Sequence, residues 1–309
     1  MKAKPILNPI TDPSRIIACR KIEADDELVL FDRLLKSGMI RFLPERDLLV
    51  PVYCHKSGRP ELRVLGGGLF CVSHKHDKDR LIYDRRPRNQ FERRLCWAEL
   101  PHGSQLTQLV LMPDETVRGS LDDLSNFFYR ISQPPGGEYQ NPVGRRWRGH
   151  ALNKRLHIDL PPNENFRAVL LVQGMGDHNG PDVAQQVHEE VLKSGGCLNP
   201  SEHLRFNTPT PLGKMWEGVY IDGRLVLQIL PKSEVRSRAS RHRDVDLVAK
   251  AEDIYDSTVG LSRAVEKEVR FQETFTAWGT EVKGRKGRVA APFSKRSCIA
   301  AVLGLVLDL

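Results

Sequence analysis

Two aspartates, Asp123 and Asp222, stand where the sequence could support metal-assisted phosphate chemistry. Asp123 ends a segment that is typical of a strand, and Asp222 lies between two apolar runs, residues 219–221 and 225–227. The pair Asp222-Gly223 supplies the positive φ angles of a two-residue turn, so we expect a β-hairpin with Asp222 at its exposed tip. One carboxylate at a strand end and another at a hairpin tip are the minimum needed to hold divalent cations against a phosphate.

The neighbours of these aspartates limit what the pair can do. Side chains alternate across a strand, so Asp122 should point to the face opposite Asp123 and is a poor substitute for an acid missing at Gly223. A plain structural interpretation also stays open, because Asp-Gly is a common hairpin signal that needs no chemistry to explain it.

The order and spacing of several short segments resemble the motifs of retroelement reverse transcriptases, with the transposon-encoded enzymes closest. Residues 123–128 look like the first palm motif of that family, and residues 220–223 look like its Tyr-x-Asp-Asp motif with glycine in the last position. Further segments resemble the fingers motif, the Leu-Pro-Gln-Gly motif with valine in place of proline, the lysine-bearing segment and the primer-grip hairpin: residues 80–89, 171–175, 260–267 and 275–282. The resemblance extends over roughly residues 28–290.

The resemblance implies an RNA-directed DNA polymerase that uses two Mg²⁺ or Mn²⁺ ions for nucleotidyl transfer. Asp123 and Asp222 would be the metal ligands, and Lys267 would protonate the leaving group. Gly223 is then a degenerate position, and the loss of a carboxylate there removes transition-state stabilisation on the order of several kcal/mol. We therefore expect a reverse-transcriptase fold with impaired catalysis.

The same resemblance assigns residues to the nucleotide and to the nucleic acid. Arg80, with Lys75 or Lys78, would neutralise the triphosphate, although lysines in a solvated turn are an equal alternative. Phe128 would exclude a ribose 2′-hydroxyl, unless it is a core aromatic residue. The nucleotide pocket would also include Gln173 and Gly174, and the contacts to nucleic acid would come from Arg86, Arg88, Trp278 and Gly279. For Trp278, hydrophobic packing is the competing role.

The fold class that the resemblance implies is α+β, a right-hand polymerase fold with an antiparallel palm sheet packed on helices. We expect a flexible N-terminal segment over residues 1–27, fingers over 28–115, and a palm over 116–250 with an inserted fingers segment at about 130–167. Residues 251–309 would complete the palm, form the primer-grip hairpin and leave little or no thumb. A chain of 309 residues accommodates this arrangement.

Local patterns predict the elements that would position these residues. A helix with Leu28, Phe31 and Leu35 on one face should end near Gly38. A helix that begins near residue 182 repeats a valine at every fourth position. The other expected elements are strands around residues 48–53, 69–73, 80–83 and 168–172, and helices over 182–192 and from 244 to about 270.

Composition favours a polyanionic partner. The chain has 47 Lys and Arg against 39 Asp and Glu, a net charge of +8, and each neutralised phosphate releases counterions. We therefore expect an RNA or DNA template-primer and dNTP as partners, within a larger element polyprotein, with a merely basic soluble surface as the alternative. The six cysteines show no paired spacing. No signal-peptide segment is recognisable and the apolar run 299–307 is too short to span a bilayer, so we expect an intracellular protein with no membrane partner.

Other interpretations stay open beside this one. Residues 169–180 have the strand, glycine turn and helix of a dinucleotide-binding loop, but no second strand ending in an acid follows. Cys71, His74 and His76 could form a metal clip, although a polar turn explains them better. A non-catalytic nucleic-acid-binding protein derived from a polymerase is the main alternative function, and a viral RNA-dependent polymerase is disfavoured by Phe128.

Overall fold

The computed structural model describes residues 18–19, 22–54, 57–74, 78–239, 242–258 and 260–307. The chain forms two compact units. Unit 1 takes its described residues from Met1–Cys96 and Phe128–Gly180, and unit 2 takes them from Trp97–Phe127 and Pro181–Leu309. Packing therefore groups residues 97–115 with the C-terminal part of the chain, and the predicted division into fingers and palm at residue 115 stays a prediction.

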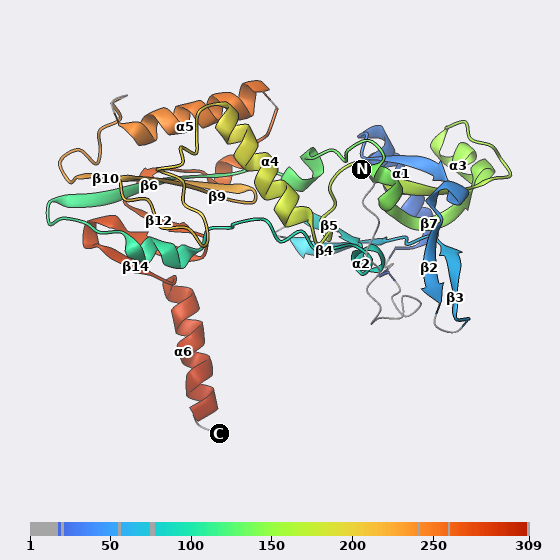
Figure 1. The fold of residues 1–309 in the computed structure, drawn as a ribbon, viewed down its shortest axis with the longest axis horizontal. Helices are drawn as coiled ribbons and strands as arrows, with labels where there is room; N and C mark the ends of the chain where they lie inside the picture. The colour runs from blue at the N-terminus through green and yellow to red at the C-terminus, as the bar shows by residue number, and fades with distance from the viewer. Residues whose placement is uncertain are drawn as a thin grey trace. The chain divides into compact units, whose positions relative to one another are not determined.

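Unit 1 combines helices with small antiparallel sheets (Figure 1). Its elements are α1 (Ala24–Lys36), β1 (Ile40–Pro44), β2 (Val50–Cys54), β3 (Arg59–Arg63), β4 (Gly68–His74), β5 (Lys78–Asp84), α2 (Arg86–Asn89), β7 (Pro142–Arg148), α3 (Gly149–Leu156) and β8 (Asn165–Leu170). One sheet has the strand order β1-β8-β7, and β2–β3 and β4–β5 are separate hairpins.

The first helix of unit 1 forms where the sequence predicts it. α1 buries Leu28, Phe31 and Leu34 in a core that also contains Ala168 of β8. Gly38 follows the end of the helix with a φ of 71°, the left-handed conformation that commonly terminates helices. The predicted amphipathic helix is therefore confirmed.

Unit 2 is built around a four-stranded antiparallel sheet. Its elements are β6 (Glu115–Asp123), α4 (Gly180–Ser194), β9 (Met215–Tyr220), β10 (Gly223–Pro231), α5 (Arg243–Asp253), β11 (Val269–Gln272), β12 (Thr274–Ala277), β13 (Thr280–Lys283), β14 (Arg288–Ala290) and α6 (Phe293–Leu307). The four strands have the order β11-β6-β10-β9, and a second sheet has the order β12-β13-β14. Helices α4 and α5 lie over one face of the four-stranded sheet, and the second sheet lies on its other side (Figure 1).

The two faces of the four-stranded sheet carry different side chains. Leu225 and Leu227 of β10 share a buried apolar cluster with Phe275 of β12. Arg224 instead points toward α5 and donates to the Leu247 carbonyl oxygen at 3.0 Å. Successive side chains of a strand point to opposite faces, so the residues that alternate with the leucines lie under the helices.

The helix predicted from residue 244 to about 270 is wrong in its C-terminal part. α5 ends at Asp253, and a π-helical turn, Ile254–Thr258, follows it. Gly260 then adopts a φ of 57°, outside helical values, and the chain continues into β11, which pairs with β6. The other predicted strands and the helix 182–192 correspond to β2, β4, β5, β8 and α4.

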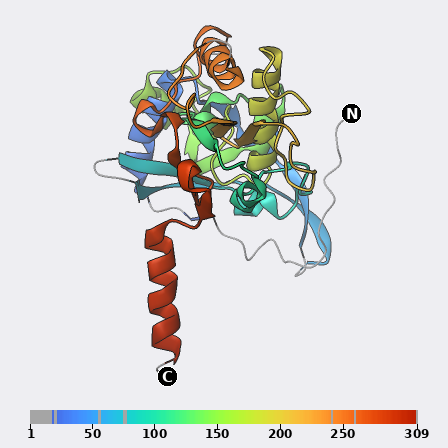
Figure 2. The same ribbon diagram turned by 90° about the vertical axis from the view of Figure 1, so that its left-hand side faces the viewer.

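The C-terminal helix α6 extends away from the sheets of unit 2 in both views (Figure 1 and Figure 2). The side chains of Phe293, Ile299 and Leu303 on this helix are 72%, 58% and 56% exposed. Within the part of the chain that the structure describes, no helix is both long and apolar enough to cross a membrane.

Candidate active site at the tip of the β9–β10 hairpin

The ends of β6 and β10 bring the two candidate metal ligands into one region of unit 2. Asp123, the last residue of β6, is the cross-strand partner of Gly223, the first residue of β10. The Leu124 N–H donates to the Asp222 carbonyl oxygen at 2.9 Å. Asp123 and Asp222, distant in the sequence, therefore lie beside each other.

The turn of the hairpin lies one residue earlier than the sequence suggests. Tyr220 pairs with Gly223, so the central residues of the turn are Ile221 and Asp222. Ile221 has a φ of 58°, whereas Asp222 and Gly223 do not have positive φ, which is the pattern of a type II′ turn. The hairpin is confirmed, but Asp222-Gly223 as its central pair is wrong, because the pairing of Gly223 with Asp123 fixes the register.

Alternation along β6 separates Asp122 from Asp123. The Asp123 side chain is 27% exposed, and its Oδ1 lies 2.5 Å from Nζ of Lys267. The Asp122 side chain is 2% exposed and forms ion pairs with Arg270 at 2.6 Å and Arg224 at 3.5 Å. Asp122 is thus neutralised under the helices, on the face opposite Asp123.

The segment that carries Lys267 is tied to the end of β6. The Ala264 N–H donates to the Asp123 carbonyl oxygen, and the Ser125 N–H donates to the Ser262 carbonyl oxygen, each at 2.8 Å. The residue assigned to protonate a leaving group is therefore in direct contact with a candidate metal ligand.

The carboxylates at the hairpin tip suit a divalent cation that takes its remaining ligands from a substrate. Mg²⁺ is commonly held by one or two carboxylates together with substrate phosphates, and Asp123 and Asp222 supply two carboxylates. Among the described residues, no group of three or more His, Cys, Asp or Glu side chains could hold a metal ion. The aspartates fit a site of this kind, and Gly223 adds no third ligand.

The backbone at Gly223 would accept a larger residue. Its φ lies outside the left-handed region, and an added Cβ would lie 3.5 Å from the Tyr220 carbonyl oxygen and 3.9 Å from that of Asp122, which are ordinary contacts. Because cross-strand partners share a face, a side chain at this position would lie beside Asp123.

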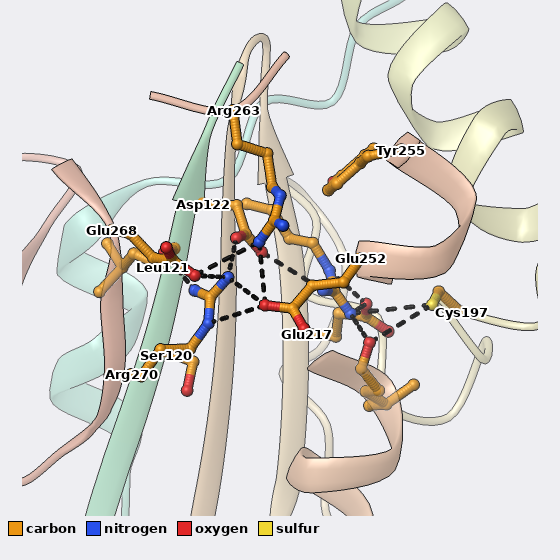
Figure 3. Close-up of polar contacts among 12 residues, drawn as sticks. Ser120, Leu121, Asp122, Cys197, Glu217, Glu252, Tyr255, Arg263, Glu268 and Arg270 are labelled. Carbon is orange, nitrogen blue, oxygen red and sulfur yellow. Dashed lines mark hydrogen bonds and ion pairs between the residues drawn. The ribbon is translucent and has the colours of Figure 1, made fainter. Parts of the chain in front are cut away.

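Behind the hairpin, buried charges link β6, β9 and β10 to α5 and β11 (Figure 3). Arg224 and Glu217 are both fully buried and lie 2.5 Å apart. Burial is the largest single influence and would lower the pKa of the Arg224 guanidinium, but Glu217, Tyr255, Cys197 and Asp122 together outweigh burial, and the pKa is raised. Arg270 joins Asp122 at 2.6 Å to Glu252 of α5 at 2.9 Å. These pairs fix the strand that ends in Asp123.

In unit 1, two residues assigned to the nucleotide pocket meet beside Gly180. An added Cβ at Gly180 would lie 3.1 Å from Nε2 of Gln173 and 3.1 Å from the half-buried ring of Phe128. Gln173 is 5% exposed, and within the described chain its buried Nε2 has no hydrogen-bond partner. Gly174 abuts the Tyr83 ring, which would lie 2.6 Å from an added Cβ, so close packing alone requires glycine there.

The residues assigned to the triphosphate belong to the β4–β5 hairpin. Arg80 is an exposed residue of β5, and Lys78 is the first residue of that strand. Lys75, and His76 of the alternative metal clip, lie outside the described residues. Their assignments stay predictions.

The two arginines assigned to nucleic acid have different surroundings. The Arg86 side chain is 62% exposed and pairs with Asp84 at 2.7 Å. Arg88 is 8% exposed, and its guanidinium donates to Glu92 at 2.8 Å. Both guanidinium groups therefore bind a carboxylate, and the exposed side chain of Arg86 is the one more open to a phosphate.

Trp278 and Gly279 form the turn of the predicted hairpin between β12 and β13. Their φ values are 47° and 74°, and positive φ at both central residues is the pattern of a type I′ turn. The Trp278 ring packs against Gly218 of β9, where an added Cβ would lie 2.7 Å from it. The packing role that the sequence left open for Trp278 is thus present.

Three buried polar side chains that the sequence patterns do not indicate contact the hairpin tip or its supports: Gln185, His188 and Tyr255. The valine repeat over residues 182–192 predicted that a different face of α4 would be buried. In the structure, the most buried residues include Ala184, His188 and Leu192, each 0% exposed. The spacing of four residues between Ala184, His188 and Leu192 was the signal in the sequence that could have identified His188 as buried.

Comparisons with known proteins support the fold. No protein-family model and no curated protein matches the chain. Among solved structures, it is similar to the foamy viral protease-reverse transcriptase in complex with dsDNA, with a TM-score of 0.56 and 15% identity over 96% of this chain and 47% of that one. It is also similar to the foamy viral protease-reverse transcriptase dRH in complex with ds DNA, with a TM-score of 0.54 and 15% identity over 97% of this chain and 41% of that one. The chain spans less than half the length of these structures and has a reverse-transcriptase-like fold of helices and antiparallel sheets.

Proposed function

We propose that this chain is the polymerase domain of a retroelement reverse transcriptase, in which Asp123 and Asp222 bind Mg²⁺ or Mn²⁺. The observation that carries the proposal is the placement of the two aspartates beside each other, at the end of β6 and the tip of the β9–β10 hairpin. The similarity to solved reverse transcriptases supports it. We also propose that the domain acts within a larger element polyprotein.

The proposed partner is an RNA or DNA template-primer duplex. The net charge of +8 favours a polyanion, and the solved structures that this chain resembles hold double-stranded DNA. Of the two arginines assigned to nucleic acid, Arg86 is the more exposed and is the one proposed to contact a phosphate.

The residues at the hairpin tip would divide the chemistry among them. A divalent cation held by Asp123 and Asp222 would lower the pKa of a primer 3′-hydroxyl and neutralise the triphosphate of the incoming dNTP. Lys267 binds Asp123 in the structure, so its ammonium must leave that carboxylate before Asp123 can bind a cation. Once released, Nζ would hold a proton for the leaving pyrophosphate.

For unit 1 we propose a nucleotide contact formed by Gln173 and Phe128. The buried Nε2 of Gln173 has a hydrogen-bond donor to offer, and the Phe128 ring lies against the same glycine, Gly180. Gln173 would bind a polar group of the nucleotide, and Phe128 would exclude a 2′-hydroxyl.

A non-catalytic nucleic-acid-binding protein is the second candidate function. Two observations favour it: Gly223 contributes no carboxylate to the site, and Lys267 already neutralises Asp123. Both candidates would bind a duplex, so only metal-dependent nucleotide incorporation separates them.

Primer extension on a poly(rA)/oligo(dT) duplex with labelled dTTP tests the proposal. The reaction is run with Mg²⁺ and with Mn²⁺, and Asp123→Ala serves as the blank. Extension above this blank would establish a working polymerase with glycine at position 223. Binding of the duplex without extension would favour the non-catalytic protein.

Gly223→Asp should raise extension by at least about tenfold, because a third carboxylate beside Asp123 stabilises a bound cation in the transition state. An added Cβ at this position meets only ordinary contacts. Gly223→Asn, which adds similar volume without charge, is the matched control and should not raise the rate. Undetectable synthesis by Gly223→Asp with both metals would contradict the claim that this position alone limits activity.

A further inference from the structure

Ile221 holds the hairpin tip in a strained backbone conformation. Its φ of 58° lies in the left-handed region, which a β-branched residue rarely occupies. Such conformations persist only where the surrounding structure enforces them, and they cluster at functional sites. The groups that enforce this one also determine where Asp222, the next residue, stands.

Two side chains of α4 bind both backbone polar groups of Ile221. The Ile221 N–H donates to Oε1 of Gln185 at 2.7 Å, and Nδ1 of His188 donates to the Ile221 carbonyl oxygen at 2.7 Å. Nε2 of Gln185 also donates to the Val219 carbonyl oxygen at 2.9 Å. Gln185 and His188 are three residues apart and share a helix face, and they are 2% and 0% exposed.

His188 is held in turn by Tyr255. The Tyr255 hydroxyl, in the π-helical turn after α5, lies 2.7 Å from Nε2 of His188. A carbonyl oxygen only accepts, so Nδ1 carries the proton and the neutral ring accepts from Tyr255 at Nε2. Burial lowers the pKa of His188 to about 4, which keeps the ring neutral near pH 7. Tyr255 itself is fully buried beside the charges of Figure 3.

The same histidine contacts the segment that follows Asp123. The Phe127 ring centroid lies 5.4 Å from that of His188, and the Tyr255 centroid lies 5.7 Å from it. Arg224 and Asp122 also act electrostatically on His188, and both lie on the helix-covered face of the sheet. Asp123 lies on the opposite face of β6 from Asp122.

We infer that Gln185, His188 and Tyr255 form a clamp that fixes the Ile221 backbone and thereby keeps Asp222 beside Asp123. They are positioning residues, because they act on Asp222 through the backbone of the turn and not on a substrate. The role of Asp222 as a metal ligand rests on the proposed function; the clamp itself rests on the hydrogen bonds.

The clamp is tested by hydrogen–deuterium exchange of the Ile221 amide in the full chain. Gln185→Leu removes the acceptor of this amide, and exchange should become about tenfold faster. Gln186→Leu makes the same change at the next residue of α4, which is exposed, and should leave the rate within about twofold of the wild type. Equal exchange in Gln185→Leu and the wild type would overturn the clamp.

A second set of variants separates the hydrogen bond of His188 from its volume. His188→Asn keeps a donor near the place of Nδ1, whereas His188→Leu has none. We expect the Ile221 amide to exchange about tenfold faster in His188→Leu than in the wild type. In His188→Asn, and in Tyr255→Phe, which loses only a hydroxyl, it should exchange at most about threefold faster. Equal acceleration in the Asn and Leu variants would overturn the role of Nδ1. If His188→Leu does not fold, the exchange rate of the Ile221 amide in His188→Asn is the test. A rate more than about threefold above the wild type would overturn the role of Nδ1, and a smaller increase would support it.

Binding of Mn²⁺ alone, followed by electron paramagnetic resonance, links the clamp to the site. The Kd for Mn²⁺ should rise about tenfold in Gln185→Leu, as is common when a group behind a metal ligand is lost, and should not change in Gln186→Leu. Faster exchange with unchanged Mn²⁺ affinity would overturn the positioning role. If Asp123→Ala binds Mn²⁺ as tightly as the wild type, the proposed metal site fails, while the exchange rates still decide whether the clamp exists.

Discussion

At the scale of residues, Asp122 and Asp123 are identical side chains in opposite surroundings. Asp122 is 2% exposed and neutralised by Arg270 and Arg224, whereas Asp123 is 27% exposed and pairs with Lys267. Loss of one charge from a buried pair leaves the other uncompensated, which costs far more than loss of an exposed pair. The first aspartate should therefore support the fold, and the second should support the chemistry.

Matched asparagine variants test this division. Asp122→Asn should lower the free energy of unfolding by about 3 kcal/mol, because Arg224 stays fully buried and loses one of its carboxylate partners. Asp123→Asn should change it by less than about 1 kcal/mol and should abolish extension. Urea denaturation followed by circular dichroism measures both values, and similar losses of stability in the two variants would contradict the division.

At the scale of elements, the second sheet of unit 2 packs closely against β6. The Phe275 ring of β12 occupies the space above Gly119, where an added Cβ would lie 2.6 Å from the ring. The Gly284 backbone approaches Val117 in the same way, with its added Cβ 2.0 Å from the carbonyl oxygen. The second sheet can therefore pack against β6, the strand that ends in Asp123, only because residues 119 and 284 are glycines.

A pair of glycine variants on the same sheet measures this packing. Gly119→Ala should lower the free energy of unfolding by about 1–3 kcal/mol, because the methyl group overlaps the Phe275 ring. Gly223→Ala makes the same change where an added Cβ meets ordinary contacts, so stability should change by less than about 1 kcal/mol. Thermal or urea unfolding compares the two, and an equal effect would show that Phe275 moves aside at little cost.

At the scale of the whole molecule, net charge is the property that affects binding to a nucleic-acid partner. The charge of +8 is carried by a chain in which many arginines already have carboxylate partners, such as Arg88 and Arg224. The excess must therefore act through exposed cations, and Arg86, although it pairs with Asp84, has a side chain that is 62% exposed. Binding to a phosphate backbone by such groups depends on salt, because bound counterions are released.

Affinity for a template-primer duplex should fall steeply with salt. Between 50 and 200 mM monovalent salt we expect the Kd to rise by at least about tenfold, as measured by fluorescence anisotropy. Asp123→Ala should follow the same curve, since that residue belongs to the chemistry and not to phosphate binding. A Kd that changes less than about twofold would argue against a nucleic-acid partner for either candidate function.

The sequence by itself determined the features that depend on local order and residue type. Leu28 and Phe31 predict α1 because helical spacing puts them on one face. The hairpin around Asp222 follows from turn residues between apolar runs, and the hairpin around Trp278 was expected from the resemblance to a primer-grip segment. The expected orientation of Asp122 away from Asp123 follows from the two-residue period of a strand. These features need no knowledge of distant contacts.

Only the tertiary structure decided which residues meet across long separations in the sequence. The pairing of β10 with β6 places Ile221 in the turn, where its φ is strained. The residues at the end of the predicted helix instead form β11, which pairs with β6. The polar Gln185 and His188 became buried because the hairpin tip presents a backbone N–H and a carbonyl oxygen to α4. Apolar periodicity cannot predict a buried polar pair, since its cost is offset only by hydrogen bonds that form once the distant segments have met.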